Sequence, residues 1–156
     1  MNIEGDKLTW VWLNFEDLTV ANLYWLLKLR QDIFIVEQDV PYTDIDNIDI
    51  ESKHLLGFSE DMLVASLRLL PKDLFEKDYI SFGRVVVRKE YRGKGLGHQL
   101  VKRLFHYLDQ HKINHNIKIS SQLYLKGFYS KYNFKVVGKP YIEDRIKHIA
   151  MIHKKS

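Results

Sequence analysis

The 156-residue sequence has no cysteine. Disulfides, thiolate zinc sites, iron–sulfur clusters and a cysteine nucleophile are therefore excluded. The absence fits a reducing compartment, and a cytoplasmic location is expected. Long apolar runs are also missing, since none approaches the roughly 18 residues of a membrane-spanning helix. Residues 1–7 include Glu4 and Asp6 and have no apolar core. This argues against a signal peptide, and no membrane partner is expected.

Charge of one sign is not gathered into a patch. The sequence carries 24 Lys and Arg against 20 Asp and Glu, a net charge of +4, and the two signs are interleaved. A nucleic-acid partner is therefore not expected, whereas a mildly basic surface suits a small anionic ligand. The 46% of hydrophobic residues exclude a disordered chain. The length predicts a single domain over residues 1–156.

The order of the expected elements predicts an α/β fold with a mixed sheet and helices on its faces. A helix over 20–36 follows Thr19, which can cap it, and a helix over 95–111 has leucines spaced by four. Glu60-Asp61 predicts a hairpin between two strands. Residues 37–52 are acidic and are expected to form a long loop. The other elements are expected at 8–13, 53–59, 62–70, 79–88, 116–120, 134–138 and 147–153 for strands and at 123–132 for a helix.

The most informative stretch is a basic, glycine-rich turn between a strand and a helix. Gly93, Gly95 and Gly97 alternate with Arg92 and Lys94 at the start of the second helix. A helix N-terminus presents unpaired N–H groups and a partial positive charge, and glycine lets the backbone approach an anion closely. The turn therefore suits a phosphate or pyrophosphate. Its spacing matches neither the dinucleotide-binding fingerprint nor the P-loop, and a simple tight turn remains an alternative.

The turn resembles the acetyl-CoA-binding motif of the GCN5-related N-acetyltransferases (GNAT). The resemblance implies a mostly antiparallel central sheet with a splayed parallel pair, and acetyl-CoA as the acyl donor. It implies that Val85 and Val87 contact the pantetheine arm through their backbones. Direct transfer also needs a donor for the oxyanion, and an N–H near Val86 or Val87 is expected to supply it. The pyrophosphate would then be held by Arg92, Gly93, Lys94, Gly95, Leu96 and Gly97.

A second segment strengthens this resemblance. Gly127-Phe128-Tyr129, followed by Asn133-Phe134, is similar to a family segment whose tyrosine protonates the departing thiolate. The resemblance thus implies that Tyr129 is the general acid. Asn133 stands where the family has glycine, and asparagine tolerates a left-handed conformation. Five motifs are similar to the ElaA-like subgroup, namely Leu29-Arg30-Gln31-x-x-Phe34-x-x-Glu37-Gln38, Ala65 to Pro71, Gly83 to Val87, Tyr124-Leu125-x-Gly127-Phe128-Tyr129, and Tyr141-x-Glu143-Asp144-x-Ile146-x-His148.

The acceptor site has several candidate residues and no decisive pattern. The planar guanidinium groups of Arg30, Arg68 and Arg84 suit an acceptor carboxylate, or else ion pairs with the acidic segment 37–52. Gln38 could orient an acceptor by hydrogen bonds or cap the helix. The proton of the incoming amine needs a base, for which Glu37, His54 and His148 are candidates. The acceptor is expected to be a small-molecule or protein amine, and the chain a monomer or homodimer.

Two alternative functions remain open from the sequence. Arg30, Phe34, Glu37, Gln38 and Arg68 also resemble the pattern of the acyl-homoserine-lactone synthases. A non-catalytic CoA-binding domain is the other alternative. No metal site is expected, because the acidic residues of 44–55 do not follow the calcium-loop pattern and the pair at 111 and 115 lacks a third ligand.

Overall fold

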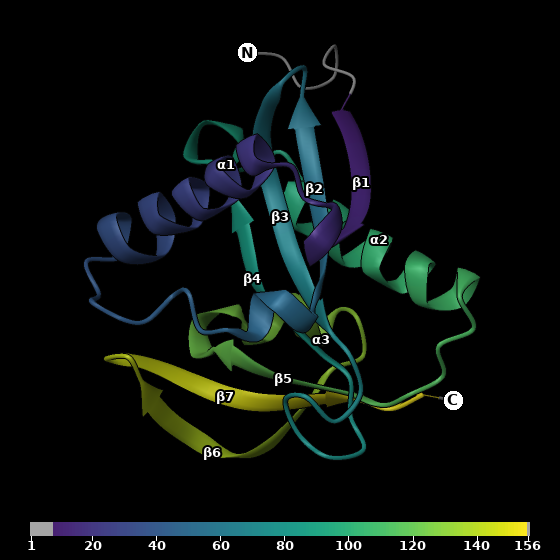
Figure 1. Ribbon diagram of the computed structural model, residues 1–156. Coiled ribbons are helices and arrows are strands. Elements are labelled where there is room, and N and C mark those ends of the chain that lie inside the picture. Colours follow the sequence, from purple (N-terminus) through teal and green to yellow (C-terminus); the bar gives the residue numbers. More distant parts are fainter. Residues whose placement is uncertain (1–7, 156) are drawn as a thin grey trace.

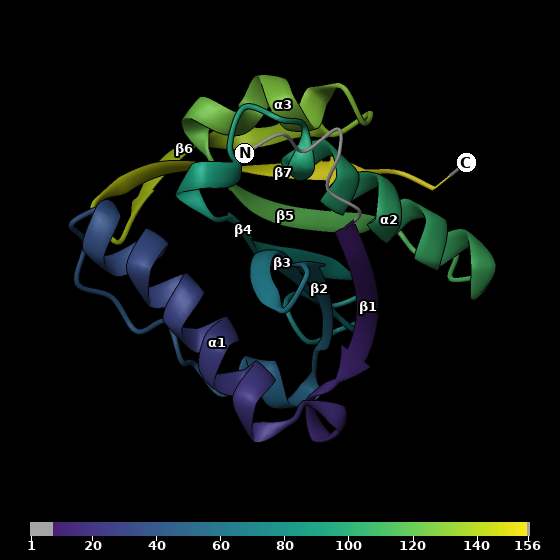
Figure 2. The same ribbon diagram turned by 90° about the horizontal axis from the view of Figure 1, so that it is seen from above.

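The computed structural model describes residues 8–155. The fold has two sheets that adjoin where β4 lies beside β5, and helices pack on them (Figures 1 and 2). The first sheet has the order β1-β2-β3-β4, with strands at Leu8–Asn14, Lys53–Ser59, Met62–Leu70 and Ser81–Val87. All its neighbours are antiparallel. The expected hairpin is confirmed, since Ser59 pairs with Met62 around Glu60-Asp61.

The second sheet completes the fold. Its order is β5-β7-β6, with strands at Ile117–Gln122, Ile146–His153 and Lys135–Glu143, and both pairings are antiparallel. The expectation that residues 134–138 form a short strand is corrected, because β6 runs on through Pro140. Proline is tolerated there because β6 is an edge strand and its register shifts between Val137 and Tyr141.

Helix α1, Val20–Arg30, begins where the sequence predicts, because the Thr19 side chain accepts a hydrogen bond from the Asn22 N–H at 3.0 Å. The expected single α-helix over 20–36 is corrected in its second half. Residues Gln31–Glu37 form a π-helix, in which the Gln38 N–H donates to the Ile33 carbonyl at 3.2 Å. The β-branched residues in this stretch favour the α-helix less. Such wide turns are frequent at functional sites.

Helices α1 and α2 cover opposite faces of the first sheet (Figure 2). Leu26 and Leu29 of α1 pack with Leu56 and Val86 in one cluster. Helix α2, Leu96–Gln110, packs in the other. The four leucines expected to face inward are at most 5% exposed, namely Leu96, Leu100, Leu104 and Leu108. At about 1.5–3 kcal/mol for each buried leucine, this face fixes α2, and hence the turn before it, on the sheet.

The two sheets are joined by one parallel contact between β4 and β5. Ile80 bridges Ile117, with hydrogen bonds of 3.1 Å to the Asn116 carbonyl and 3.0 Å from the Lys118 N–H. No further pairing between these strands is formed in the part of the chain that the structure describes. The strands therefore diverge beyond this bridge, which is the expected splayed parallel pair in a mixed, mostly antiparallel α/β fold. The divergence leaves the backbone of β4 after Ile80 open on one side.

Candidate functional site

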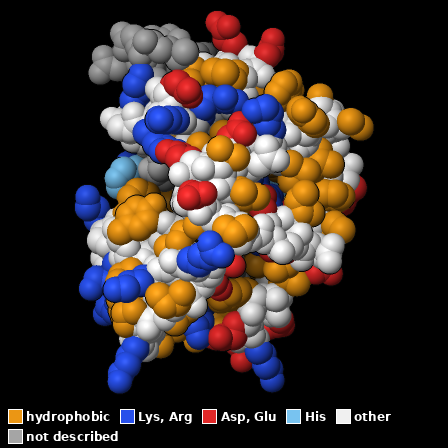
Figure 3. Space-filling model, turned by 90° about the vertical axis from the view of Figure 1, so that its left-hand side faces the viewer, with side chains coloured by type: hydrophobic (Ala, Val, Ile, Leu, Met, Phe, Trp, Pro, Cys, Tyr) orange, Lys and Arg blue, Asp and Glu red, His pale blue; other side chains and the backbone are white. Residues whose placement is uncertain are grey.

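The turn before α2 has the geometry of an anion site. Gly93 and Gly95 have φ of 76° and 81°, the left-handed region that favours glycine, and a Cβ at either position would meet nothing within 4 Å. Gly95 precedes the first turn of α2, and within residues 8–155 no side chain caps that turn. Its N–H groups can therefore bind phosphate oxygens. Figure 3 shows the face on the left-hand side of Figure 1. Lys and Arg side chains gather in its upper part, at the height of the turn in Figure 1.

Arg92 connects this turn with the π-helix. Its Nη1 and Nη2 donate to the two carboxylate oxygens of Glu37 at 2.6 and 2.5 Å, and its Nε donates to the Val87 carbonyl at 3.2 Å. The hydrogen bonds from Arg92 lower the pKa of Glu37. The sequence predicts Arg92 as a ligand of the pyrophosphate and Glu37 as a base for the acceptor amine, and the structure pairs these two residues with each other. Glu37 is ionised and engaged, so it would need to leave Arg92 before taking a proton from an amine.

The open stretch of β4 contains a bulge. Ser66 pairs with Val86 and Arg68 with Gly83, so two residues of β4 face one residue of β3. Arg84 lies in this bulge with φ of 49°, a conformation that costs a residue with a Cβ about 1–3 kcal/mol. Three hydrogen bonds, two of them to Asp44, hold its guanidinium. Beyond the bulge Val86 and Val87 rejoin the ladder with Ser66 and Ala65, and the other side of this strand segment faces the splay.

Tyr129 lies in α3, Lys126–Ser130, between the splay and the core. It is 5% exposed, and its ring packs edge-on against Phe82 and Phe134 at 5.9 Å between centroids. Burial, and to a lesser extent the neighbouring Tyr124, raises the pKa of Tyr129. The hydroxyl has no hydrogen-bond partner within residues 8–155. It therefore keeps its proton at neutral pH and is available as a donor. Asn133, just beyond, has the expected left-handed φ of 64°.

Three arginines and three aspartates form a buried cluster that fastens the acidic segment to the sheet. Arg30 donates to Asp44 at 3.0 Å and to both oxygens of Asp49 at 2.8 and 3.1 Å. Arg68 donates to both oxygens of Asp46 at 2.8 and 2.7 Å. Ion pairing with residues 37–52 was one of the two alternatives for these arginines, and it is the one that the structure shows. In this arrangement Arg30, at 1% exposure, presents no surface to an acceptor.

This cluster makes the fold sensitive to acid. Burial alone would raise the pKa of Asp46, but hydrogen bonds and charge from Arg68 outweigh it and lower the pKa to about 2. Arg30 and Arg68 likewise outweigh burial and lower the pKa of Asp49. A folded pKa below the unfolded value of about 3.9 gives stability that is present above pH 4 and is lost as the pH falls toward 2.

We expect the urea midpoint of unfolding to fall steeply between pH 4 and 2. Circular dichroism at a series of pH values measures it. Asp46→Asn removes one of the titrating groups, so its midpoint should be lower at pH 7 and should change less over the same pH range. An unchanged pH dependence in Asp46→Asn would contradict this account.

The remaining sequence candidates lie in different places. His54 is 1% exposed and its Nε2 donates to the Asp49 carbonyl at 2.9 Å, so it belongs to the arginine–aspartate cluster. Burial lowers the pKa of His54, which keeps its ring neutral. Gln38 ends the π-helix. His148, on β7, donates from Nδ1 to the Ile146 carbonyl at 2.8 Å, and its Nε2 lies 3.5 Å from a carboxylate oxygen of Glu143.

Several residues of the site were missed by sequence reasoning. Tyr124 is 74% exposed and lies in the turn Leu123–Leu125 that follows β5, the strand that borders the splay. Glu143 and Tyr141 adjoin His148. All three stand inside motifs that resemble the ElaA-like subgroup, and this was the available signal. Their spacing alone does not predict that they meet, because they belong to different elements.

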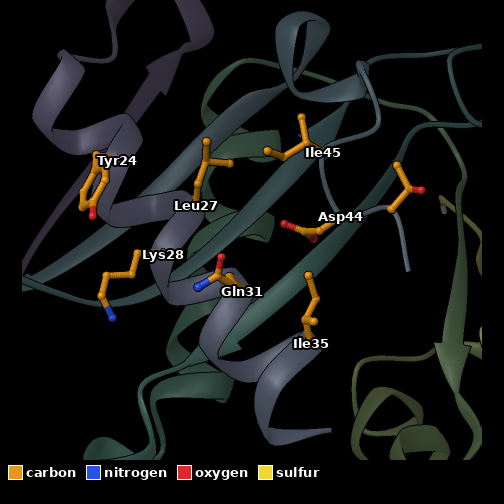
Figure 4. A pocket seen from close by; sticks show the side chains of 8 residues that line it. Tyr24, Leu27, Lys28, Gln31, Ile35, Asp44 and Ile45 are labelled. Carbon is orange, nitrogen blue, oxygen red and sulfur yellow. The ribbon is translucent and has the colours of Figure 1, made fainter. Parts of the chain in front are cut away.

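A pocket of about 530 Å³ lies between α1, the π-helix and the acidic segment (Figure 4). Asp44, which binds Arg30 and Arg84, forms part of its wall. None of the residues expected to bind the acyl donor lines it. The remaining lining residues are Tyr24, Leu27, Lys28, Gln31, Ile35, Thr43 and Ile45.

Residues 8–155 contain no group of three or more His, Asp or Glu placed to hold a metal ion. None of the helices among these residues is long and apolar enough to cross a membrane.

Comparisons with known proteins agree with this geometry. Residues 35–155 match the family model described as an acetyltransferase (GNAT) domain. The chain therefore belongs to the GNAT acetyltransferase family, and it is an acyltransferase. It is 36% identical to Protein ElaA of Escherichia coli over 92% of this chain and 95% of that one, and falls in the ElaA-like subgroup.

Solved structures extend the comparison. An acyl-CoA N-acyltransferase from Pseudomonas aeruginosa is similar with a TM-score of 0.88 and 36% identity, covering 94% of this chain and 99% of that one. A CoA-dependent acyl-homoserine lactone synthase, BjaI, solved with SAM and isopentyl-CoA, is similar with a TM-score of 0.77. At 18% identity over 94% of this chain and 82% of that one, this likeness concerns the fold alone.

Proposed function

We propose that the protein transfers an acetyl group from acetyl-CoA to a primary amine by direct attack on the thioester. The observation that carries the proposal is the open glycine turn at the start of α2 beside the splay between β4 and β5. The turn would bind the pyrophosphate through the N–H groups of residues 95–97 and the charge of Lys94. The open backbone of Val85–Val87 would pair with the pantetheine arm, which directs the thioester toward Tyr129.

The reaction would need two things from the chain besides binding. An N–H near Val86 or Val87, on the side of β4 that faces the splay, would stabilise the oxyanion of the tetrahedral intermediate. The Tyr129 hydroxyl would protonate the thiolate as it leaves. The raised pKa of Tyr129 supports this assignment, because the phenol enters the reaction as an acid. The chain has no cysteine to form a thioester with the enzyme, in agreement with direct transfer.

Calorimetry with coenzyme A tests the binding half of the proposal. A screen of primary amines with acetyl-CoA, followed by thiol release and by mass spectrometry of the products, tests the transfer half. No heat with coenzyme A from folded protein would reject the proposal. Binding without any acetylated product would instead support a CoA-binding domain that does not catalyse transfer. A strict requirement for an acyl-carrier protein would favour the lactone-synthase alternative.

Tyr129→Phe is expected to lower kcat about a hundredfold and to leave the coenzyme A affinity unchanged. The substitution removes the proton donor but keeps the ring that packs against Phe82 and Phe134. Tyr107→Phe is the matched control. Tyr107, on α2, is also buried, but its ring packs against Trp12 of β1 and not beside the splay. Full turnover by Tyr129→Phe would remove the role assigned to Tyr129.

A further inference from the structure

Four polar side chains from β5, β6 and β7 meet on one face of the second sheet. The Tyr141 hydroxyl hydrogen-bonds to Ser120 Oγ, and Ser120 Oγ donates to Glu143 Oε2 at 3.5 Å. The same carboxylate oxygen lies 3.5 Å from His148 Nε2. The small Ala150 stands opposite Ser120 on β7, which lets Tyr141 reach across the strand between them. The result is a continuous chain from Tyr141 through Ser120 and Glu143 to His148.

The register places this group beside the splay. Gln122 pairs with His148, and His148 pairs with Tyr141, so these three side chains form a row on one face of the sheet. Gln122 lies five residues beyond the Ile80–Ile117 bridge, and because β4 has one extra residue at the Arg84 bulge, Gln122 stands at about the height of Val85 or Val86. Strands are about 4.8 Å apart. His148 is therefore one strand beyond the edge of the splay, on the face opposite to the buried Ile117 and Ile119.

The hydrogen bonds fix the roles of the two His148 nitrogens. Nδ1 carries a hydrogen, because the Ile146 carbonyl at 2.8 Å can only accept. Nε2 is therefore the nitrogen that exchanges a proton, and it faces Glu143. The Tyr141 ring stacks on the imidazole with 22° between planes and 6.1 Å between centroids. Glu143 and Tyr141 are the titratable groups that contact His148 from β6, whereas β5 contributes the uncharged Ser120 and Gln122.

We propose that His148 is the residue that takes the proton from the acceptor ammonium group. The carboxylate of Glu143, 3.5 Å from the same nitrogen, stabilises the imidazolium that forms, and Ser120 and Tyr141 hold it in place. The acceptor is a primary amine on an aromatic or apolar carrier, since the half-exposed Tyr141 ring stacks on His148 and the exposed Tyr124 ring lies in the turn directly before α3. This inference rests on the acyl transfer proposed above.

The proton balance of the step is complete. The ammonium gives one proton to His148 Nε2, which leaves a neutral amine and an imidazolium. The amine nitrogen bonds to the thioester carbon while the carbonyl electrons move onto oxygen. When the carbonyl re-forms, the C–S bond breaks and the thiolate takes the Tyr129 proton. The tyrosinate recovers a proton from the new amide nitrogen, and His148 releases its own to water. An ammonium and a thioester thus give an amide, a thiol and one proton.

Two acceptors of nearly the same shape can show whether His148 acts as a base or has only a structural role. Phenethylamine is protonated at pH 7 and needs a base, whereas O-benzylhydroxylamine is neutral at this pH and does not. His148→Asn keeps a donor for the Ile146 carbonyl but lacks Nε2. It should lower kcat/KM about a hundredfold with phenethylamine and less than about threefold with O-benzylhydroxylamine. The exposed His106→Asn is the matched control and should change neither rate.

Glu143→Gln tests whether the carboxylate stabilises the imidazolium. It should lower kcat with phenethylamine about tenfold, with KM for acetyl-CoA unchanged and the rate with O-benzylhydroxylamine retained, and Glu143→Asp should restore part of the loss. Equal losses on both acceptors would overturn the proposal, as would full activity of His148→Asn. A wild-type protein that binds coenzyme A and acetylates neither amine would overturn the acceptor class. Absence of coenzyme A binding would instead reject the proposed function.

Discussion

Gly95→Asp is expected to weaken coenzyme A binding at least a hundredfold, while Gly95→Asn stays within a fewfold of the wild type. Both residues tolerate the left-handed backbone that Gly95 adopts, and both can cap a helix. They differ in one charge, which Asp places where the diphosphate is expected. Two like charges about 4 Å apart near a protein surface repel by about 4 kcal/mol, nearly three factors of ten in affinity.

Calorimetry at fixed salt measures both dissociation constants. The comparison removes backbone strain as an explanation, because the two side chains have nearly the same size and shape. Similar affinities for the Asp and Asn variants would show that the diphosphate does not lie at this turn. Loss of binding in both variants, with the fold intact, would mean that the side-chain volume at position 95 is the cause and would leave the charge argument without support.

Arg30→Met is expected to lower the free energy of unfolding by about 3–5 kcal/mol. The substitution leaves Asp44 and Asp49 with one fewer cation in a region where their side chains are 6% and 9% exposed. Removing one partner of a buried ion pair leaves an uncompensated buried charge, and this costs far more than the pair itself contributes. Asp44 keeps its hydrogen bonds from Tyr42 and Arg84, so we expect a loss of unfolding free energy near the lower end of this range.

Lys28→Met is the matched control on the same helix. Lys28 pairs with Asp32 at 2.7 Å, but the two side chains are 47% and 40% exposed. An exposed pair contributes about 0–1 kcal/mol. Urea unfolding followed by circular dichroism gives both values. Comparable losses for the two substitutions would contradict the importance given to burial. Arg30→Lys should fall between them, since it keeps the charge and loses the planar set of donors.

The sequence determined those parts of the fold that depend on neighbours along the chain. Thr19 caps α1 through a residue three positions away, and leucines spaced by four turn one face of α2 inward. The glycine turn is likewise local, because positive φ at Gly93 and Gly95 and a free helix N-terminus are properties of a few consecutive residues. These features were predictable because their energies are decided within one or two turns.

Only the tertiary structure decided which polar groups meet. Arg30 and Asp49 are 19 residues apart, Arg84 and Asp44 are 40, and Glu37 and Arg92 are 55. The same guanidinium could pair with an acceptor carboxylate or with the chain itself, and residue type does not distinguish the two. Likewise, His148, Glu143 and Ser120 come together because the register of three strands places them on one face of the second sheet. Register follows from burying a whole sheet face, and no local pattern contains it.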